Sequence, residues 1–146
     1  MKREKYLWPL SQSHHRALMA ARRVREQLSP VPEGQESGRL KIVSSELKNL
    51  NEGELRQHFW DEERILGIFE DRMGTGDPDV ERIRKDHRLL ESLLLLNTRE
   101  SLLQFADTLV GHIRFEEDIF FGRLEKALDE TRRLIVSEIL PKTPNL

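Results

Sequence analysis

The sequence predicts an all-α protein: an up-down-up-down four-helix bundle followed by a short additional C-terminal helix. Strong helix formers dominate and β-branched residues are few. No stretch alternates apolar and polar residues for long enough to predict a strand, whereas apolar residues recur every three or four positions in the long segments. Loops of about two to ten residues join these segments and favour antiparallel neighbours.

The first two helices are expected over residues 10–28 and 39–72, each with an apolar stripe on one face. A proline- and glycine-rich stretch at 29–34 separates them. Gly74 and Gly76 suit the C-cap and turn that end the second helix.

The third helix is expected to begin with Asp77 as N-cap and Pro78 at the first helical position, and to break at Asn97-Thr98. The fourth opens near Ser101, where Gln104 three positions on completes a capping-box pattern. The bundle then covers about residues 10–128, and a tail helix at about 131–140 ends before a proline.

Length and composition limit the possible functions. The chain has 146 residues, which predicts a single domain over 1–146, and 34% of them are charged with a net charge of -2. This balance gives no electrostatic basis for binding nucleic acid or a membrane surface. Without cysteine, disulfides and thiolate metal sites are excluded. Because no apolar run has the length of a signal peptide or a membrane span, we expect a cytoplasmic protein.

Histidine and glutamate interrupt the apolar stripes of the second and fourth helices. His58 and Glu62 lie four positions apart on one stripe, and His112 and Glu116 lie four apart on the other. An acidic residue follows each glutamate, so the two stretches resemble an internal duplication. Two buried carboxylates are costly unless a cation neutralises them, and no lysine or arginine shares these stripes near the pairs. We therefore predict a metal site.

The other two long helices each offer one histidine to this site. His87 lies on the apolar stripe of the third helix, and counting residues from the loops places it at the level of the two pairs. In the first helix, His14 has an apolar residue four positions before it and another three positions after it, as His87 does. We therefore choose His14 as the ligand, with His15 as the alternative. Glu91 also lies four positions after His87, which shows that spacing alone is a weak criterion.

One histidine from each of the first and third helices, with His-x-x-x-Glu from each of the second and fourth, resembles the hemerythrin-like (HHE cation-binding) family over about residues 10–128. The resemblance implies a non-haem di-iron centre that binds two iron ions. Its metal ligands would be the six residues His14, His58, Glu62, His87, His112 and Glu116. The two carboxylates would bridge the ions, leaving a position for dioxygen, nitric oxide or peroxide.

Two departures from the oxygen carriers of that family change the expected role. The carriers have a pair of histidines four positions apart on the third helix, whereas this chain has Ile83 four positions before His87 and Glu91 four positions after it. They also place the last acidic ligand five positions after the histidine, where this chain has Glu117, and we prefer Glu116. Sensing, storage or iron handling thus becomes as plausible an expectation as reversible oxygen transport.

The residues around these motifs have simpler interpretations. Glu63, Glu117 and Asp118 are interpreted as solvated acids, with hydrogen bonds to ligand histidines as the alternative. The neighbouring aromatic residues are interpreted as core and as walls of the site, where they would also control access of solvent to the metals. These aromatic residues are Phe59, Trp60, Phe115, Phe120 and Phe121.

We expect a binding or sensing protein rather than an enzyme, with dioxygen or another small diatomic or peroxide ligand as its partner. A di-iron enzyme that acts on peroxide or nitric oxide is the first alternative, although the chain has no cysteine and its one tyrosine, Tyr6, lies outside the motifs. A metal-free helical interaction module is the second alternative.

Overall fold

The computed structural model describes residues 3–141, and every regular element in that range is helical. The all-α prediction is therefore confirmed. The α-helices are α1 (Trp8–Leu28), α2 (Glu36–Leu50), α3 (Arg56–Met73), α4 (Pro78–Leu96), α5 (Arg99–Phe115), α6 (Phe121–Ala127) and α7 (Glu130–Ile139). A short 3-10 helix, η1 (Lys5–Leu7), precedes α1.

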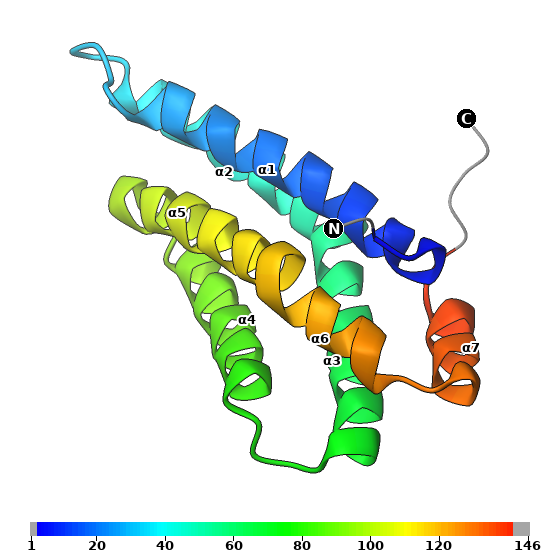
Figure 1. The fold of residues 1–146 in the computed structure, drawn as a ribbon. Helices are drawn as coiled ribbons and strands as arrows, with labels where there is room; N and C mark the ends of the chain where they lie inside the picture. Colours follow the sequence, from blue (N-terminus) through cyan, green and yellow to red (C-terminus); the bar gives the residue numbers. More distant parts are fainter. Residues whose placement is uncertain (1–2, 142–146) are drawn as a thin grey trace.

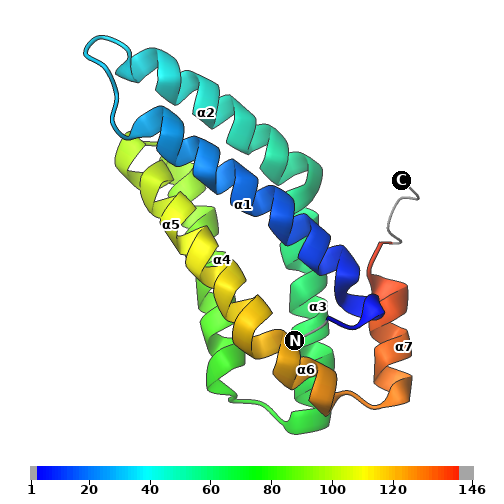
Figure 2. The ribbon, with the colours of Figure 1, turned by 45° about the horizontal axis from the view of Figure 1, so that its top comes forward.

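The helices run back and forth, and the centre of the molecule lies between α1, α3, α4 and α5 (Figure 1). Helices α1 and α2 form an antiparallel pair that extends beyond the rest at the loop between them (Figure 2). Helix α5 packs against both α1 and α4, while α3 contacts α4, α6 and α7. The tail helix predicted at about 131–140 is α7, and it packs against α3 and η1.

Two of the expected long helices are continuous but contain a π-helical turn. The helix predicted at 39–72 consists of α2, η2 (Asn51–Leu55) and α3, and the chain changes direction at η2 (Figure 1). The fourth predicted helix consists of α5, η3 (Glu116–Phe120) and α6. Single π turns inside α-helices are frequent at functional sites. The count of four bundle helices stays a prediction, because these turns divide two of them.

The helix ends confirm one predicted cap and correct another. Asp77 caps α4, since its side chain accepts from the backbone N–H of Asp79 at 2.9 Å. Helix α5 begins three residues earlier than predicted, because Thr98 rather than Ser101 is the N-cap, and Thr98 forms a capping box with Ser101. Ser101 is thus the third residue of the helix rather than its cap. The preceding residue, Asn97, takes the left-handed conformation with φ 51° that ends α4.

Two apolar clusters form the core, and a polar layer separates them. One cluster contains Leu28, Leu47 and Leu109, toward the loop between α1 and α2. The other contains Phe69 and Phe120, toward the end where α3 meets α4. Each of the four stripe histidines lies on its helix between a residue of one cluster and a residue of the other. The core therefore places the four histidines at one level, as the residue counts predicted.

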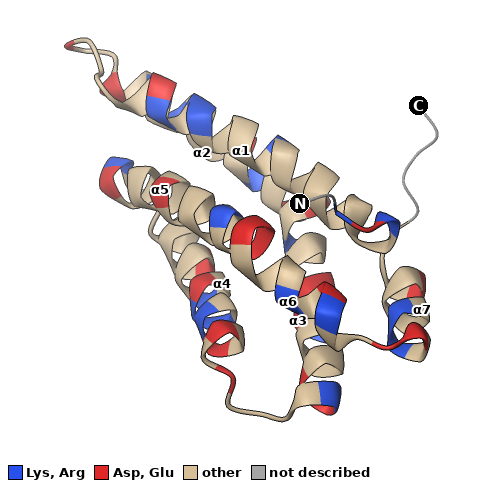
Figure 3. Cartoon of the chain, viewed as in Figure 1, with Lys and Arg blue, Asp and Glu red and all other residues tan. Residues whose placement is uncertain are grey.

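The charged residues lie mostly on the outer faces of the helices, with acidic and basic side chains interspersed (Figure 3). Many of them form ion pairs between neighbouring helices, such as Arg23 with Glu46 at 2.6 Å and Arg123 with Asp77 at 2.6 Å. None of the helices described for residues 3–141 combines the length and the apolar character needed to cross a membrane.

Candidate metal centre

The structure brings together the six predicted ligands from four helical segments, and all six are buried. His14 comes from α1, His87 from α4 and His112 from α5; the remaining three are His58 and Glu62 from α3 and Glu116 at the start of η3. The alternative ligand His15 falls outside the cluster, because its side chain is exposed, and Glu91, which has the same spacing from His87, is exposed as well.

Glu62 lies at the middle of the cluster and reaches all four histidines through their Nε2 atoms. Its Oε2 lies 3.1 Å from His58 and 3.4 Å from His14. Its Oε1 lies 2.9 Å from His87 and 3.6 Å from His112. Each carboxylate oxygen thus faces one pair of histidines, and Glu62 joins a His14–His58 half to a His87–His112 half.

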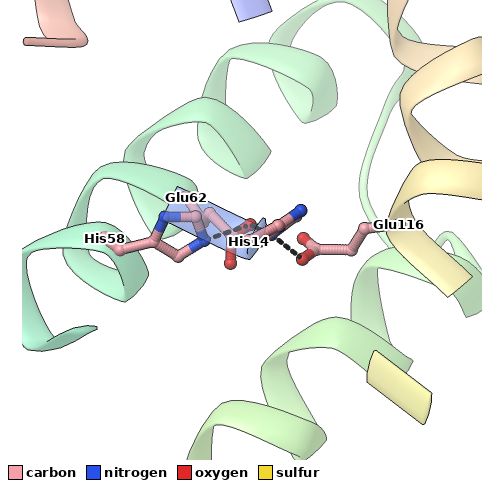
Figure 4. Close-up of side chains that lie close together, drawn as sticks. All are labelled: His14, His58, Glu62 and Glu116. Carbon is pink, nitrogen blue, oxygen red and sulfur yellow. Dashed lines mark ion pairs between the residues drawn. The ribbon is translucent and has the colours of Figure 1, made fainter. Parts of the chain in front are cut away.

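Glu116 is the second buried carboxylate and contacts one histidine from each half. Its Oε1 lies 3.1 Å from Nε2 of His14 and 3.0 Å from Nε2 of His112. Figure 4 shows Glu116 approaching His14 from the side opposite Glu62 and His58. The side chain is only 1% exposed, whereas that of Glu117 is 29% exposed and lies outside the cluster. The geometry therefore favours Glu116 over Glu117.

Three of the histidines use their other ring nitrogen to bind a carboxylate outside the cluster. The Nδ1–H of His14 donates to Glu117 at 2.9 Å, and that of His87 donates to Glu63 at 3.0 Å. The interpretation of Glu63 and Glu117 as solvated acids is therefore wrong, and the alternative, hydrogen bonds to histidines of the cluster, is correct. Such bonds fix the orientation of the ring, so that Nε2 faces the cluster.

The third outer carboxylate is Asp86, which accepts from Nδ1 of His112 at 3.1 Å and which sequence reasoning missed. Asp86 belongs to α4, next to His87, and serves a histidine on a different helix. An acidic residue adjacent to a stripe histidine is the signal that could have identified it. Asp118, by contrast, is exposed as expected.

The outer carboxylates are themselves held in place. Ser11 donates to both oxygens of Glu117 at 2.9 and 2.8 Å, and Arg3 lies 3.8 Å from the same carboxylate. Arg84 donates to Glu63 at 3.3 Å. A histidine of the cluster is thus positioned by a chain of contacts that extends to the surface.

Aromatic rings cover the histidines on two sides. Phe59 stacks on His87 with ring centroids 4.5 Å apart, and Phe121 stacks on His14 at 5.5 Å. Phe115, Phe120 and Phe121 are buried in the core, as predicted. Trp60 does not belong to the core, because its side chain is 62% exposed. It directly follows Phe59 on α3 and so points away from the core face of the helix.

Burial and the surrounding charges shift the pKa values of these groups strongly in the metal-free chain. Burial alone would lower the pKa of His87, but hydrogen bonds to Glu62 and Glu63 outweigh it and raise the pKa to about 9. The pKa values of His14 and His112 are also raised, because their carboxylate partners outweigh burial. Burial opposes ionisation of Glu62, yet the histidines hold its pKa well below the usual range.

Several buried atoms at the centre of the cluster have no hydrogen-bond partner among residues 3–141. They are Nε2 of His14, His58 and His112, Oε2 of Glu62 and Oε1 of Glu116. Unsatisfied buried polar atoms are uncommon in folded proteins, and imidazole with carboxylate suits iron, manganese and zinc. The ligand atoms form two groups within 4.8 Å of one another: His14, His58, Glu62 and Glu116, and Glu62, His87 and His112. These residues therefore fit a metal centre.

Comparison with known protein families supports the same conclusion. The model of the hemerythrin HHE cation-binding domain matches residues 8–124, which is most of the chain. Comparisons with curated proteins and with solved structures found no match. The matched range contains all six residues of the cluster, together with the outer carboxylates Glu63, Asp86 and Glu117. The chain belongs to the hemerythrin HHE cation-binding domain family.

Proposed function

We propose that this protein is a non-haem di-iron protein, with an up-down-up-down bundle that holds two iron ions and binds dioxygen or a related small molecule. The observation that carries the proposal is the convergence of four histidine Nε2 atoms on two buried carboxylates. His14 and His58 would hold one ion and His87 and His112 the other, with Glu62 and Glu116 shared between them. Bound iron would supply one-electron redox chemistry and a position for a small ligand.

The chain's own residues would prepare this site for metal. Glu117, Glu63 and Asp86 keep a proton on the Nδ1 of their histidines, so that Nε2 faces the centre. Phe59 and Phe121 cover His87 and His14 and reduce contact with water. The apolar clusters on both sides fix the level of the ligands along the helices. These contacts preorganise the site, which lowers the cost of binding metal.

The experiment that tests this function is iron reconstitution with metal analysis, thermal unfolding and the visible spectrum in air. We expect about two irons per chain, a new visible absorption and a higher melting temperature. Iron at 100 times its dissociation constant stabilises a protein by about 2.7 kcal/mol per site. The double variant Glu62→Ala with Glu116→Ala should lose all three signals.

The matched control is Glu91→Ala, because Glu91 has the same spacing from His87 but an exposed side chain outside the cluster. This variant should bind iron as the wild type does. If the wild type holds no iron and its melting temperature does not change on iron addition, the chain is a metal-free helical module and the proposal is wrong.

A further inference from the structure

A groove opens beside the metal centre, between α2 and α4. Its volume is about 620 Å³, which lies in the usual range for sites that accept small molecules. Helices α2 and α4, the turn η2 and the first residues of α3 form its walls. The apolar side chains that line it are Leu47, Phe59, Trp60, Leu94, Leu95 and Leu102.

Phe59 lies between this groove and the cluster. Its ring lines the groove, stacks on His87 and meets His112 edge-on, with centroids 5.9 Å apart. It also meets His58 edge-on at 5.8 Å. Of the six proposed ligands, His87 alone is among the described lining residues of the groove. A molecule in the groove would therefore reach the centre next to Phe59 and at the His87–His112 half.

The His87–His112 half has no third histidine. Glu116 lies 3.0 Å from His112 and 3.1 Å from His14, so each half has two histidines and the same two carboxylates within reach. One helical turn before His87 the chain has Ile83, which is fully buried in the apolar cluster and supplies no metal ligand. A metal ion bound there would therefore keep part of its coordination for a molecule from outside.

We propose that a small exogenous ligand reaches the His87–His112 half of the centre through this groove, and that Phe59 controls its entry. The ligand class is a small molecule such as a diatomic gas or azide, because Phe59 packs against His58, His87 and His112 and separates the groove from the centre. This inference rests on the proposed function, since it concerns access to bound iron.

A second cavity, of about 180 Å³, provides the rival route. It reaches His58 beside Ser13, Gln57 and Asp61, on the His14–His58 half. Arg16 and Glu54, which also line it, form a hydrogen-bonded ion pair at 2.6 Å. The test must therefore distinguish the two entrances.

The test measures the rate at which azide binds the iron(III)-loaded protein, from the absorbance of the complex after rapid mixing. Leu94→Trp fills the groove without altering the cluster and should slow association by about tenfold, within the range over which rates vary among variants of one site. Dissociation should slow equally, leaving the affinity unchanged. Phe59→Ala should accelerate both association and dissociation of azide. The matched control Gln57→Trp fills the second cavity and should change neither of the two rates.

A second variant tests which half receives the ligand. Ile83→His adds an imidazole one helical turn before His87 and should reduce the extent of azide binding at unchanged iron content. Ile83→Leu is its control. Since Ile83 is buried, helicity and iron content are measured first; if the histidine variant does not fold, the rates of Leu94→Trp and Phe59→Ala decide the matter.

Two results would overturn the inference with iron present: slower association in Gln57→Trp but not in Leu94→Trp, or no change in any variant. A wild-type protein that holds no iron overturns the proposed function and this inference with it. Metal analysis before mixing identifies that case separately.

Discussion

The two His-x-x-x-Glu motifs that supply the cluster, at His58 and His112, use the same pattern for two purposes. In each, the first glutamate lies inside the cluster: Glu62 in one motif and Glu116 in the other. The next residue binds the outer nitrogen of a histidine on another helix: Glu63 binds His87 of α4, and Glu117 binds His14 of α1. A short repeated sequence therefore supplies both the central carboxylates and the groups that orient the remaining histidines.

The motifs differ in how much of the cluster each controls. Glu62 lies between the two halves and contacts all four Nε2 atoms, whereas Glu116 contacts only those of His14 and His112 among the described residues. Their local backbone also differs, because the π turn ends before His58 in one motif and begins at Glu116 in the other. Similar sequences thus occupy unequal positions in the centre.

The largest expected effect comes from exchanging the two central carboxylates for amides. Glu62→Gln should weaken binding at both metal positions by more than about 100-fold, the upper end of effects seen for groups that only support a ligand. Glu116→Gln should leave binding measurable, because His87 and His112 keep their contacts with Glu62. Titration calorimetry with iron(II) under anaerobic conditions measures both. An equal loss of metal affinity in the two variants would contradict the conclusion that Glu62 controls more of the cluster than Glu116.

The outer carboxylates give the next effect. Glu117→Gln and Glu63→Gln should each reduce metal affinity about 10- to 100-fold, because the histidine loses its charged partner. The loss should be larger for Glu117, which Ser11 and Arg3 hold in place, than for Glu63, which is 37% exposed. Competition with a metal chelator measures the affinities. If both variants bind as the wild type does, these hydrogen bonds do not contribute to binding.

The pH dependence of stability tests whether the cluster acts through its histidines. In the metal-free protein the raised pKa of His87 adds stability that is complete below the ordinary histidine pKa of 6.5 and is lost as pH rises through about 9. The lowered pKa of Glu62 adds stability above the ordinary glutamate pKa of 4.5, and this stability is lost as pH falls through the folded-state pKa. The metal-free melting temperature should thus fall between about pH 7 and pH 10.

Bound metal should make stability rise with pH in the histidine range, where these shifts alone give no such rise. Protons compete with metal for Nε2, so the iron-loaded protein should gain melting temperature and retain more iron as pH rises from about 5 to 7. Thermal scans of both forms in matched buffers make the comparison. Parallel profiles for the two forms would show that the histidines do not hold the metal.

The smallest expected effect concerns a residue outside both motifs, and it tests whether metal binding is independent of that end of the fold. Asp77 caps α4 and pairs with Arg123 of α6 at 2.6 Å. Asp77→Ala should lower the free energy of unfolding by about 1 to 2 kcal/mol through loss of the cap. The metal affinity of this variant should stay unchanged. Chemical denaturation and metal titration measure the two quantities, and a loss of metal here would mean that the centre depends on this end of the fold.

The sequence was sufficient to predict the helices and the six residues of the cluster because both depend on local periodicity. Stripe positions every three or four residues place His58 with Glu62 and His112 with Glu116 on the core side of their helices. The separation of His14 from His15 followed from the same rule, and the structure buries only the first.

Features that depend on tertiary contacts escaped sequence reasoning. Asp86 is on α4 but serves His112 on α5, which no spacing along one helix indicates. The roles of Glu63 and Glu117 depend on histidines of other helices in the same way. The π turns were also missed, because no proline interrupts the helical pattern at either one and a single glycine, Gly53 in η2, is tolerated inside a helix.

The most direct test of the central claim is anomalous diffraction at the iron absorption edge from crystals of the iron-loaded protein. The account predicts two anomalous peaks inside the cluster, one beside His14 and His58 and one beside His87 and His112, with Glu62 between them. A single peak on the protein surface, or an empty cluster in iron-loaded crystals, would contradict it.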